Sequence, residues 1–141
     1  GRLSGPLLDR FDMRIRLLPV PPTELFEDGS GESSDVVLGR VEEAREAQRR
    51  RWKGPSSNGR VSDVAVRRAN GYDSPARSLL IRLVTTHRLS ARATRRLERV
   101  ARTVADLEGA GAVTESHLML ALRFRLGGEM EAQVEHGSAG S

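Results

Sequence analysis

The clearest helical periodicity in the chain lies in residues 90–109, which read SARATRRLERVARTVADLEG. Ser90 is a favourable N-cap before the first turn, and Gly109 is a favourable residue just after the last one. Between them, apolar residues recur every three or four positions, which predicts an amphipathic helix with one face in a core. These residues are Ala93, Leu97, Val100, Ala101, Val104 and Leu107.

Two flanking segments predict helices that pack against this one. Ser74-Pro75 places an N-cap before a proline at the first helical position, and Thr114 begins a segment that is apolar around most of its circumference. Because it is apolar all round, we expect the helix after Thr114 to be central. The apolar positions are Leu79, Leu80, Leu83, Val84 and His87 in the first segment, and Leu118, Met119, Ala121, Leu122 and Leu126 in the second.

A longer helix is predicted between Ser34 or Asp35, as its cap, and about Trp52. A short apolar patch over 61–66 predicts a partial helix. The loops between these segments are short, so the helices are expected to form a compact bundle. The predicted fold is therefore all-α, with the helical domain over residues 33–126 and a disordered tail over 127–141.

The N-terminal part differs from this pattern. Residues 3–12 predict a helical turn, and the alternating stretch 13–17 predicts a strand that Pro19 and the following prolines end. Thr23 is expected to cap one further turn through Phe26. A single strand has no sheet to join, which suggests a segment cut from a larger fold. We expect residues 1–32 to be flexible for the same reason.

Composition limits the function classes. The 141 residues suit one domain, and the net charge of +4 permits contact with phosphates without requiring it. The absence of Cys excludes disulfides and thiolate zinc sites. The three histidines show no ligand spacing, so no metal site is expected. No apolar run approaches the roughly 20 residues that span a bilayer, so we expect a cytoplasmic protein without membrane contact.

Arg10 lies between two carboxylates, Asp9 and Asp12. A guanidinium stays charged and bonds two phosphate oxygens at once, so a rigidly held arginine stabilises charge on a transferring phosphoryl group. The alternative is a surface ion pair between Arg10 and one of its acidic neighbours.

The helix over 90–109 carries five arginines on one side, which the spacing places roughly opposite the apolar stripe. Their mutual repulsion must be offset by acidic residues, phosphates, a partner subunit or nucleic acid. The alternative is a solvated face screened by Glu98 and Asp106. The arginines are Arg92, at the helix start, and Arg95, Arg96, Arg99 and Arg102.

Two segments together resemble the magnesium chelatase-like AAA+ ATPases. Residues 3–12, LSGPLLDRFD, are similar to the arginine-finger segment of that family, and residues 89–107 are similar to its sensor-2 helix. Residues 117–125 are similar to its last lid helix. Thr94 and Arg95 depart from the pattern, because relatives often have an aromatic residue after Ser-Ala-Arg-Ala.

The resemblance implies specific roles. Arg10 would be the arginine finger that reaches ATP bound by a neighbouring subunit, and Arg92 would be the sensor-2 residue at the γ-phosphate. The partners would be subunits of a homo-oligomeric ring, expected to be a hexamer, with ATP and Mg²⁺ bound in the parent protein. Arg95, Arg96, Arg99 and Arg102 would contact phosphate, DNA or a subunit.

The resemblance also implies that the domain is an AAA+ lid carrying a remnant of the α/β core at its N-terminus. The Walker A and B motifs would precede Gly1, so this chain alone is not expected to hydrolyse ATP. The parent motor would act on DNA, in recombination or branch migration. Two alternatives remain open: a basic helical module that binds nucleic acid, and the ATPase subunit of a true magnesium chelatase, which inserts metal into a porphyrin.

Overall fold

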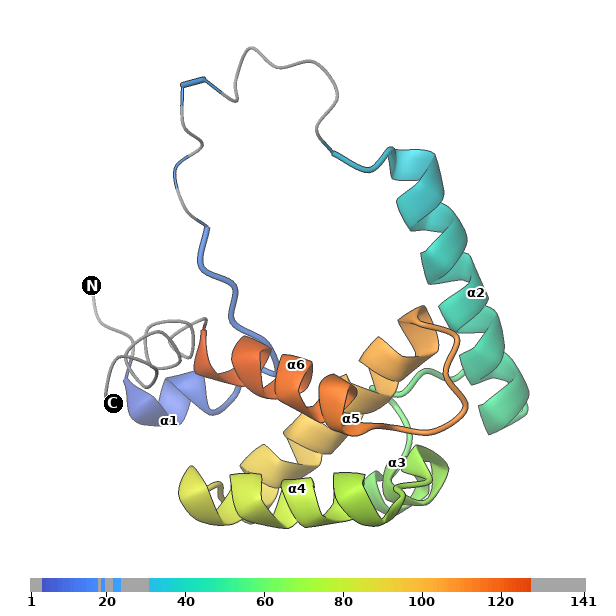
Figure 1. Ribbon diagram of the computed structural model, residues 1–141. Coiled ribbons are helices and arrows are strands. Elements are labelled where there is room, and N and C mark those ends of the chain that lie inside the picture. Colours follow the sequence, from blue (N-terminus) through green and yellow to red (C-terminus); the bar gives the residue numbers. More distant parts are fainter. Residues whose placement is uncertain (1–3, 18, 20–21, 24–30, 128–141) are drawn as a thin grey trace, which may run out of the picture.

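The computed structural model describes residues 4–17, 19, 22–23 and 31–127, which contain six helices and no strand (Figure 1). The all-α fold class is thus confirmed. The predicted turn over 23–26 and the tail after residue 127 lie outside or mostly outside the described residues. The helices are α1 (Gly5–Leu8), α2 (Ser34–Trp52), α3 (Asp63–Asn70), α4 (Ser74–Thr86), α5 (Ala91–Leu107) and α6 (Glu115–Leu126).

Side-chain caps fix where the helices begin. Ser90 Oγ accepts a hydrogen bond of 3.1 Å from Ala93 N, which confirms the predicted cap of α5. The caps of α2 and α4 lie one residue or more before the predicted ones, at Ser33 and Asp73. Asp73 has an extended backbone, whereas Ser74 is already helical. The Asp73 carboxylate, rather than the Ser74 hydroxyl, therefore accepts the hydrogen bond from the free backbone N–H of Ala76.

Helix α5 is the centre of the domain, rather than α6 as predicted. It packs against α2, α3 and α6, while α4 packs against α6 (Figure 1). The predicted stripe on α5 is buried except for Leu107, whose exposed fraction is 41%. The core combines that stripe with one face each of α4 and α6: Ala76, Leu79, Leu83, Leu97, Val100, Ala101, Val104, Ala105, Val113, Leu118, Ala121 and Leu122.

A buried arginine joins α5 to its surroundings. Arg102 has no exposed surface, and its guanidinium donates to Asp106 Oδ1 at 3.2 Å. It also donates to three backbone carbonyls, those of Ala69 at 3.1 Å, Gly111 at 3.0 Å and Ala110 at 2.7 Å. Burial lowers the pKa of Arg102, and the charge of Asp106 partly opposes that shift. The side chain thereby holds the end of α3 and the loop between α5 and α6 to the core.

Asp106 extends this network to α2. Its carboxylate accepts two hydrogen bonds from Arg51, at 2.5 and 2.9 Å, and one of 2.9 Å from Asn58 Nδ2. Asn58 in turn accepts from Trp52 Nε1 at 3.0 Å. The C-terminal end of α2 and the loop after it are therefore fixed to α5 by polar contacts that are mostly removed from water.

The segment after α1 does not form the predicted strand, because no other strand lies beside it among the described residues. It runs instead along the C-terminal end of α6. Arg14 N donates to Phe124 O at 2.7 Å, and Arg14 Nε donates to Arg125 O at 2.8 Å. These bonds satisfy carbonyls in the last turn of α6, which have no partner within the helix.

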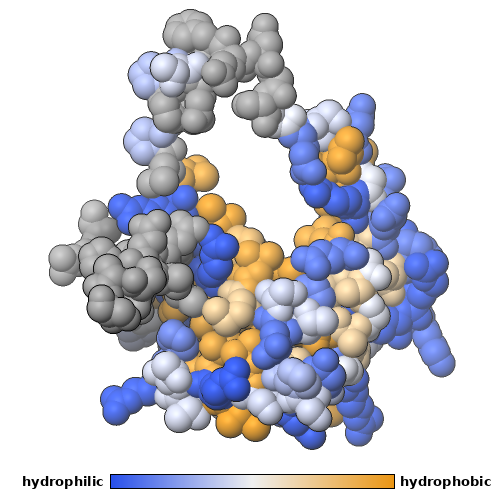
Figure 2. All heavy atoms as spheres, viewed as in Figure 1, coloured by the Kyte–Doolittle hydropathy of each residue, from blue (hydrophilic) through white to orange (hydrophobic). Residues whose placement is uncertain are grey.

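The N-terminal half of α2 projects away from the other helices (Figure 1). It leaves an apolar patch of Val36, Val37 and Leu38 exposed at its end, visible as an orange area in Figure 2. Across the described stretches, no helix is long and apolar enough to cross a bilayer.

We predict that Arg102→Met lowers the free energy of unfolding by about 3 kcal/mol, because three backbone carbonyls lose their donor and the buried Asp106 loses one of its two cations. Urea unfolding of the chain measures this. The matched control is Arg68→Met on the exposed side of α3, which should change stability by less than about 0.5 kcal/mol. Equal losses in the two variants would show that the network is not required.

Candidate phosphate-binding site

Four of the five arginines on α5 line one pocket at the N-terminal end of that helix. The pocket has a volume of about 300 Å³ and also contains two aspartates, so its lining carries two more positive than negative charges. The remaining lining residue, Gly59, belongs to the loop before α3. The full lining is Asp12, Gly59, Asp63, Arg92, Arg95, Arg96 and Arg99.

One wall of the pocket is held by Arg99. Its guanidinium donates to the carbonyls of Asn58 and Val61, the latter at 3.1 Å, and it forms an ion pair with Asp63. Arg95 approaches the same carboxylate at 3.8 Å while more than half of its side chain stays exposed. Arg99 is thus tied to the loop before α3, and Arg95 retains an exposed positive charge.

The N-terminal segment also contributes to the pocket, through Asp12. Arg96 Nη1 donates to Arg10 O at 2.7 Å and forms an ion pair with Asp12. This contact joins residues that are 84 positions apart in the sequence. The sequence does not indicate that the α1 segment and α5 form one site, since the residue spacing within one segment does not predict a contact with the other.

Arg92 lines this pocket from the first turn of α5. Its side chain is exposed, and it forms no hydrogen bond or ion pair with any residue in 4–17, 19, 22–23 or 31–127. The unpaired N–H groups and the dipole of a helix add positive potential at its N-terminus. Arg92 is therefore a cation with no internal partner in a region of positive potential.

Arg10 has a fixed backbone and an exposed side chain. The predicted pairing of Arg10 with Asp9 or Asp12 is wrong, because other arginines take both carboxylates. Asp9 accepts from Arg125 Nη2 at 2.6 Å, and Asp12 pairs with Arg96. Within the described part of the chain, the Arg10 guanidinium forms no hydrogen bond or ion pair, and the side chain is exposed.

The prediction that all five arginines lie opposite the buried stripe is wrong for Arg102. Its side chain is completely buried, so it cannot contact a phosphate, DNA or another subunit. The alternative, in which Glu98 and Asp106 screen a solvated face, is also wrong, since both carboxylates are buried and paired with arginines. An arginine four residues before an aspartate on one helix is the sequence signal that could have indicated this pair.

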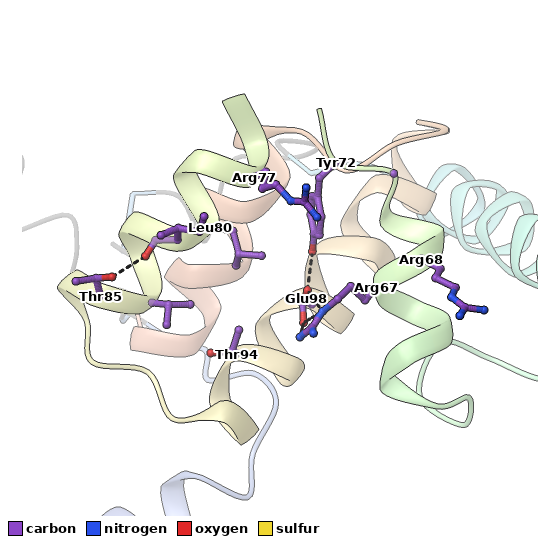
Figure 3. A pocket seen from close by; sticks show the side chains of 11 residues that line it. Arg67, Arg68, Tyr72, Arg77, Leu80, Thr85, Thr94 and Glu98 are labelled. Carbon is purple, nitrogen blue, oxygen red and sulfur yellow. Dashed lines mark hydrogen bonds and ion pairs between the residues drawn. The ribbon is translucent and has the colours of Figure 1, made fainter. Parts of the chain in front are cut away.

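A second, larger hollow of about 550 Å³ lies between α3, α4 and α5 (Figure 3). Leu80 and Val84 of α4 form its apolar side. Its polar side is Glu98, which accepts from Arg67 at 2.7 and 2.9 Å and lies 3.4 Å from the Tyr72 hydroxyl. The hydrogen bond and the charge of Glu98 raise the pKa of Arg67, while burial and that carboxylate raise the pKa of Tyr72.

His117 has a structural role. Its Nδ1 accepts from Thr114 N at 3.0 Å as part of the capping box of α6, and its Nε2 lies 2.8 Å from Glu108. In the described parts of the chain, no group of three or more His, Asp or Glu side chains is placed to hold a metal ion.

Comparison with known proteins identifies the family of this domain. Residues 31–125, from before α2 to the end of α6, match the family model described as magnesium chelatase, subunit ChlI C-terminal. Arg92 and its pocket partners on α5 lie within that match, and Arg10 lies before it.

Three curated relatives extend the similarity. The uncharacterized protein YifB of Salmonella typhimurium is 41% identical over 127 residues, its namesake in Escherichia coli is 36% identical, and the competence protein ComM of Haemophilus influenzae is 34% identical over 126 residues. Each match covers 89% of this chain and 24% of the relative, so the chain spans about a quarter of the length of these proteins. The chain belongs to the magnesium chelatase family, to its ChlI C-terminal domain.

Proposed function

We propose that this domain is the helical lid of a magnesium chelatase-like AAA+ ATPase, in which Arg92 contacts the γ-phosphate of ATP and Arg10 acts as an arginine finger. The observation that carries the proposal is the pocket at the start of α5, where Arg92 has no internal partner beside three further arginines. A planar guanidinium binds phosphate oxygens through two parallel hydrogen bonds, and the helix N-terminus adds to the attraction.

The state of Arg10 supports its assigned role. A finger that acts on a neighbouring subunit must combine a fixed backbone with a side chain that no internal carboxylate neutralises. Both carboxylates beside Arg10 are bonded to other arginines, and its own carbonyl is held by Arg96. Such an arginine, placed at the γ-phosphate, stabilises the charge that develops during phosphoryl transfer.

In this proposal the full-length protein forms a homo-oligomeric ring, expected to be a hexamer, that binds ATP and Mg²⁺ in residues outside this chain. We favour DNA as its substrate, in recombination or branch migration, over a porphyrin. One relative is named a competence protein, and competence is the uptake of DNA. The position and charge of Arg10 and Arg92 do not distinguish a motor that acts on DNA from one that acts on a porphyrin, because both motors hydrolyse ATP.

We predict that Arg10→Ala in the full-length protein lowers ATP turnover at least a hundredfold, because a finger arginine contributes about 10³–10⁵ to the rate of such reactions. The affinity for a fluorescent ATP analogue should stay within about threefold, since a trans-acting finger contributes mainly in the transition state. The matched control is Arg16→Ala, an exposed arginine of the same segment. Turnover near wild type in Arg10→Ala would remove the assignment of Arg10.

We predict that Arg92→Ala weakens binding of a non-hydrolysable ATP analogue more than binding of ADP, because only the former presents a γ-phosphate. A lost charge-assisted contact corresponds to about a tenfold change in affinity. Titration calorimetry of the full-length protein with both ligands measures the difference. Equal weakening for the two nucleotides would place Arg92 away from the γ-phosphate.

The structure gives less support to a nucleic-acid-binding module. Of the five arginines on α5, only Arg92 and Arg95 keep mostly exposed side chains. If this face binds duplex DNA, the logarithm of the affinity should fall with the logarithm of salt concentration with a slope of about −2, since each neutralised phosphate contributes about −0.9. Fluorescence anisotropy of the chain at low and moderate salt concentrations tests this, and the absence of binding at low salt would exclude the module.

A further inference from the structure

We infer that Arg96 is a positioning residue that holds the arginine finger of its own subunit in place for the active site of the neighbouring subunit. The inference rests on the proposed function of Arg10. It assigns a separate task to an arginine that lines the pocket beside Arg92 without needing to touch the nucleotide.

The contact made by Arg96 is directed at the finger residue itself. One nitrogen, Nη1, donates both to the backbone carbonyl of Arg10 and to the carboxylate of Asp12, two residues later. The carbonyl bond fixes the peptide unit from which the Arg10 side chain extends. The bond to Asp12 also keeps that carboxylate away from the Arg10 guanidinium, which would otherwise have an acidic neighbour two positions away.

The same segment is held from a second helix. Arg125 of α6 donates to Phe11 O at 3.0 Å and to Asp9 at 2.6 Å. The segment is therefore attached to the lid at Arg10 itself and on both sides of it. Arg96 from α5 holds the Arg10 carbonyl, and Arg125 from α6 holds the Asp9 carboxylate and the Phe11 carbonyl. The Arg10 side chain itself is exposed and is not bonded to the described part of the lid.

The burial of Arg96 fits this task better than direct nucleotide contact. Only 20% of its side chain is exposed, and its guanidinium is already bonded to the N-terminal segment. Arg92, one helical turn earlier, is exposed and has no such attachment. The two arginines thus have different environments within one pocket. A small displacement of a catalytic group costs on the order of a hundredfold in rate, so loss of the Arg96 contact should be visible in turnover.

The decisive experiment mixes inactive subunits of the full-length protein. An ATP site in a ring combines the pocket of one subunit with the finger of the next. We predict that Arg96→Ala, like Arg10→Ala, lowers turnover tenfold or more, and that a 1:1 mixture of the two variants regains no activity, because every finger in such a ring is defective. Energy transfer between labelled subunits verifies that mixed rings form.

A mixture of Arg10→Ala with Arg92→Ala is the matched control. If Arg92 acts in its own pocket, about a quarter of the interfaces in that mixture pair an intact pocket with an intact finger, and activity returns. Regain of activity in the Arg10→Ala and Arg96→Ala mixture would overturn the inference and place the action of Arg96 in its own pocket. Near-wild-type turnover of Arg10→Ala alone would instead overturn the proposed function.

Two further variants separate positioning from a loss of folding. Arg96→Lys should restore part of the turnover, since an ammonium group reaches the Arg10 carbonyl or Asp12 without the geometry of a guanidinium. Asp12→Asn weakens the same contact from the other side and should behave as Arg96→Ala does in the mixtures. Both variants, and Arg96→Ala itself, should unfold at the wild-type urea concentration. Low turnover that follows a lower unfolding midpoint would mean that Arg96 only stabilises the domain.

Discussion

The rest of the structure depends on the buried ion pair between Arg102 and Asp106. A buried charge without compensation is very costly, and here each partner is fully compensated: Asp106 by Arg51 and Asn58, and Arg102 by three carbonyls. These partners come from α2, the end of α3 and the loop before α6. All of the hydrogen bonds can therefore form in only one rotational orientation of α5 about its axis. That rotation sets which of the remaining arginines face the pocket.

Helix α5 therefore uses the same residue type for two purposes. Arg102 points inward and connects the domain, while Arg92 and Arg95, near the other end of the helix, keep exposed guanidinium groups. Arg96 and Arg99 are intermediate, each bonded to a backbone carbonyl of a neighbouring segment. The repulsion expected among five adjacent cations is thus relieved mainly by carbonyls and aspartates of the same chain, and only the N-terminal end of the helix is left with unneutralised charge.

Local pattern was sufficient to predict α2, α4, α5, α6 and most of the α5 stripe, because caps and apolar periodicity act over a few residues. The short helix predicted over 61–66 lies instead at Asp63–Asn70. Local pattern was insufficient for the site. The bonds from Arg96 to Asp12 and from Arg125 to Asp9 join residues 84 and 116 positions apart, and an aspartate beside Arg10 in the sequence gives no sign of which distant arginine will pair with it. Arg102 was misplaced because helical periodicity treats every arginine as polar and exposed, whereas the long side chain reached carbonyls that complete its hydrogen bonding inside the core.

The attachment of the N-terminal segment also changes how the two arginines of the proposed ATP site relate to each other. Without it, Arg10 and Arg92 would move independently, one on a loose extension and the other on a folded helix. With Arg96 one turn after Arg92 and bonded to the carbonyl of Arg10, both arginines are fixed to α5. In the proposed ring, a rigid-body movement of α5 would therefore displace two contacts together: the γ-phosphate contact in one subunit and the finger presented to the next. Under the proposed function, the helical domain would be the element that mechanically connects adjacent ATP sites.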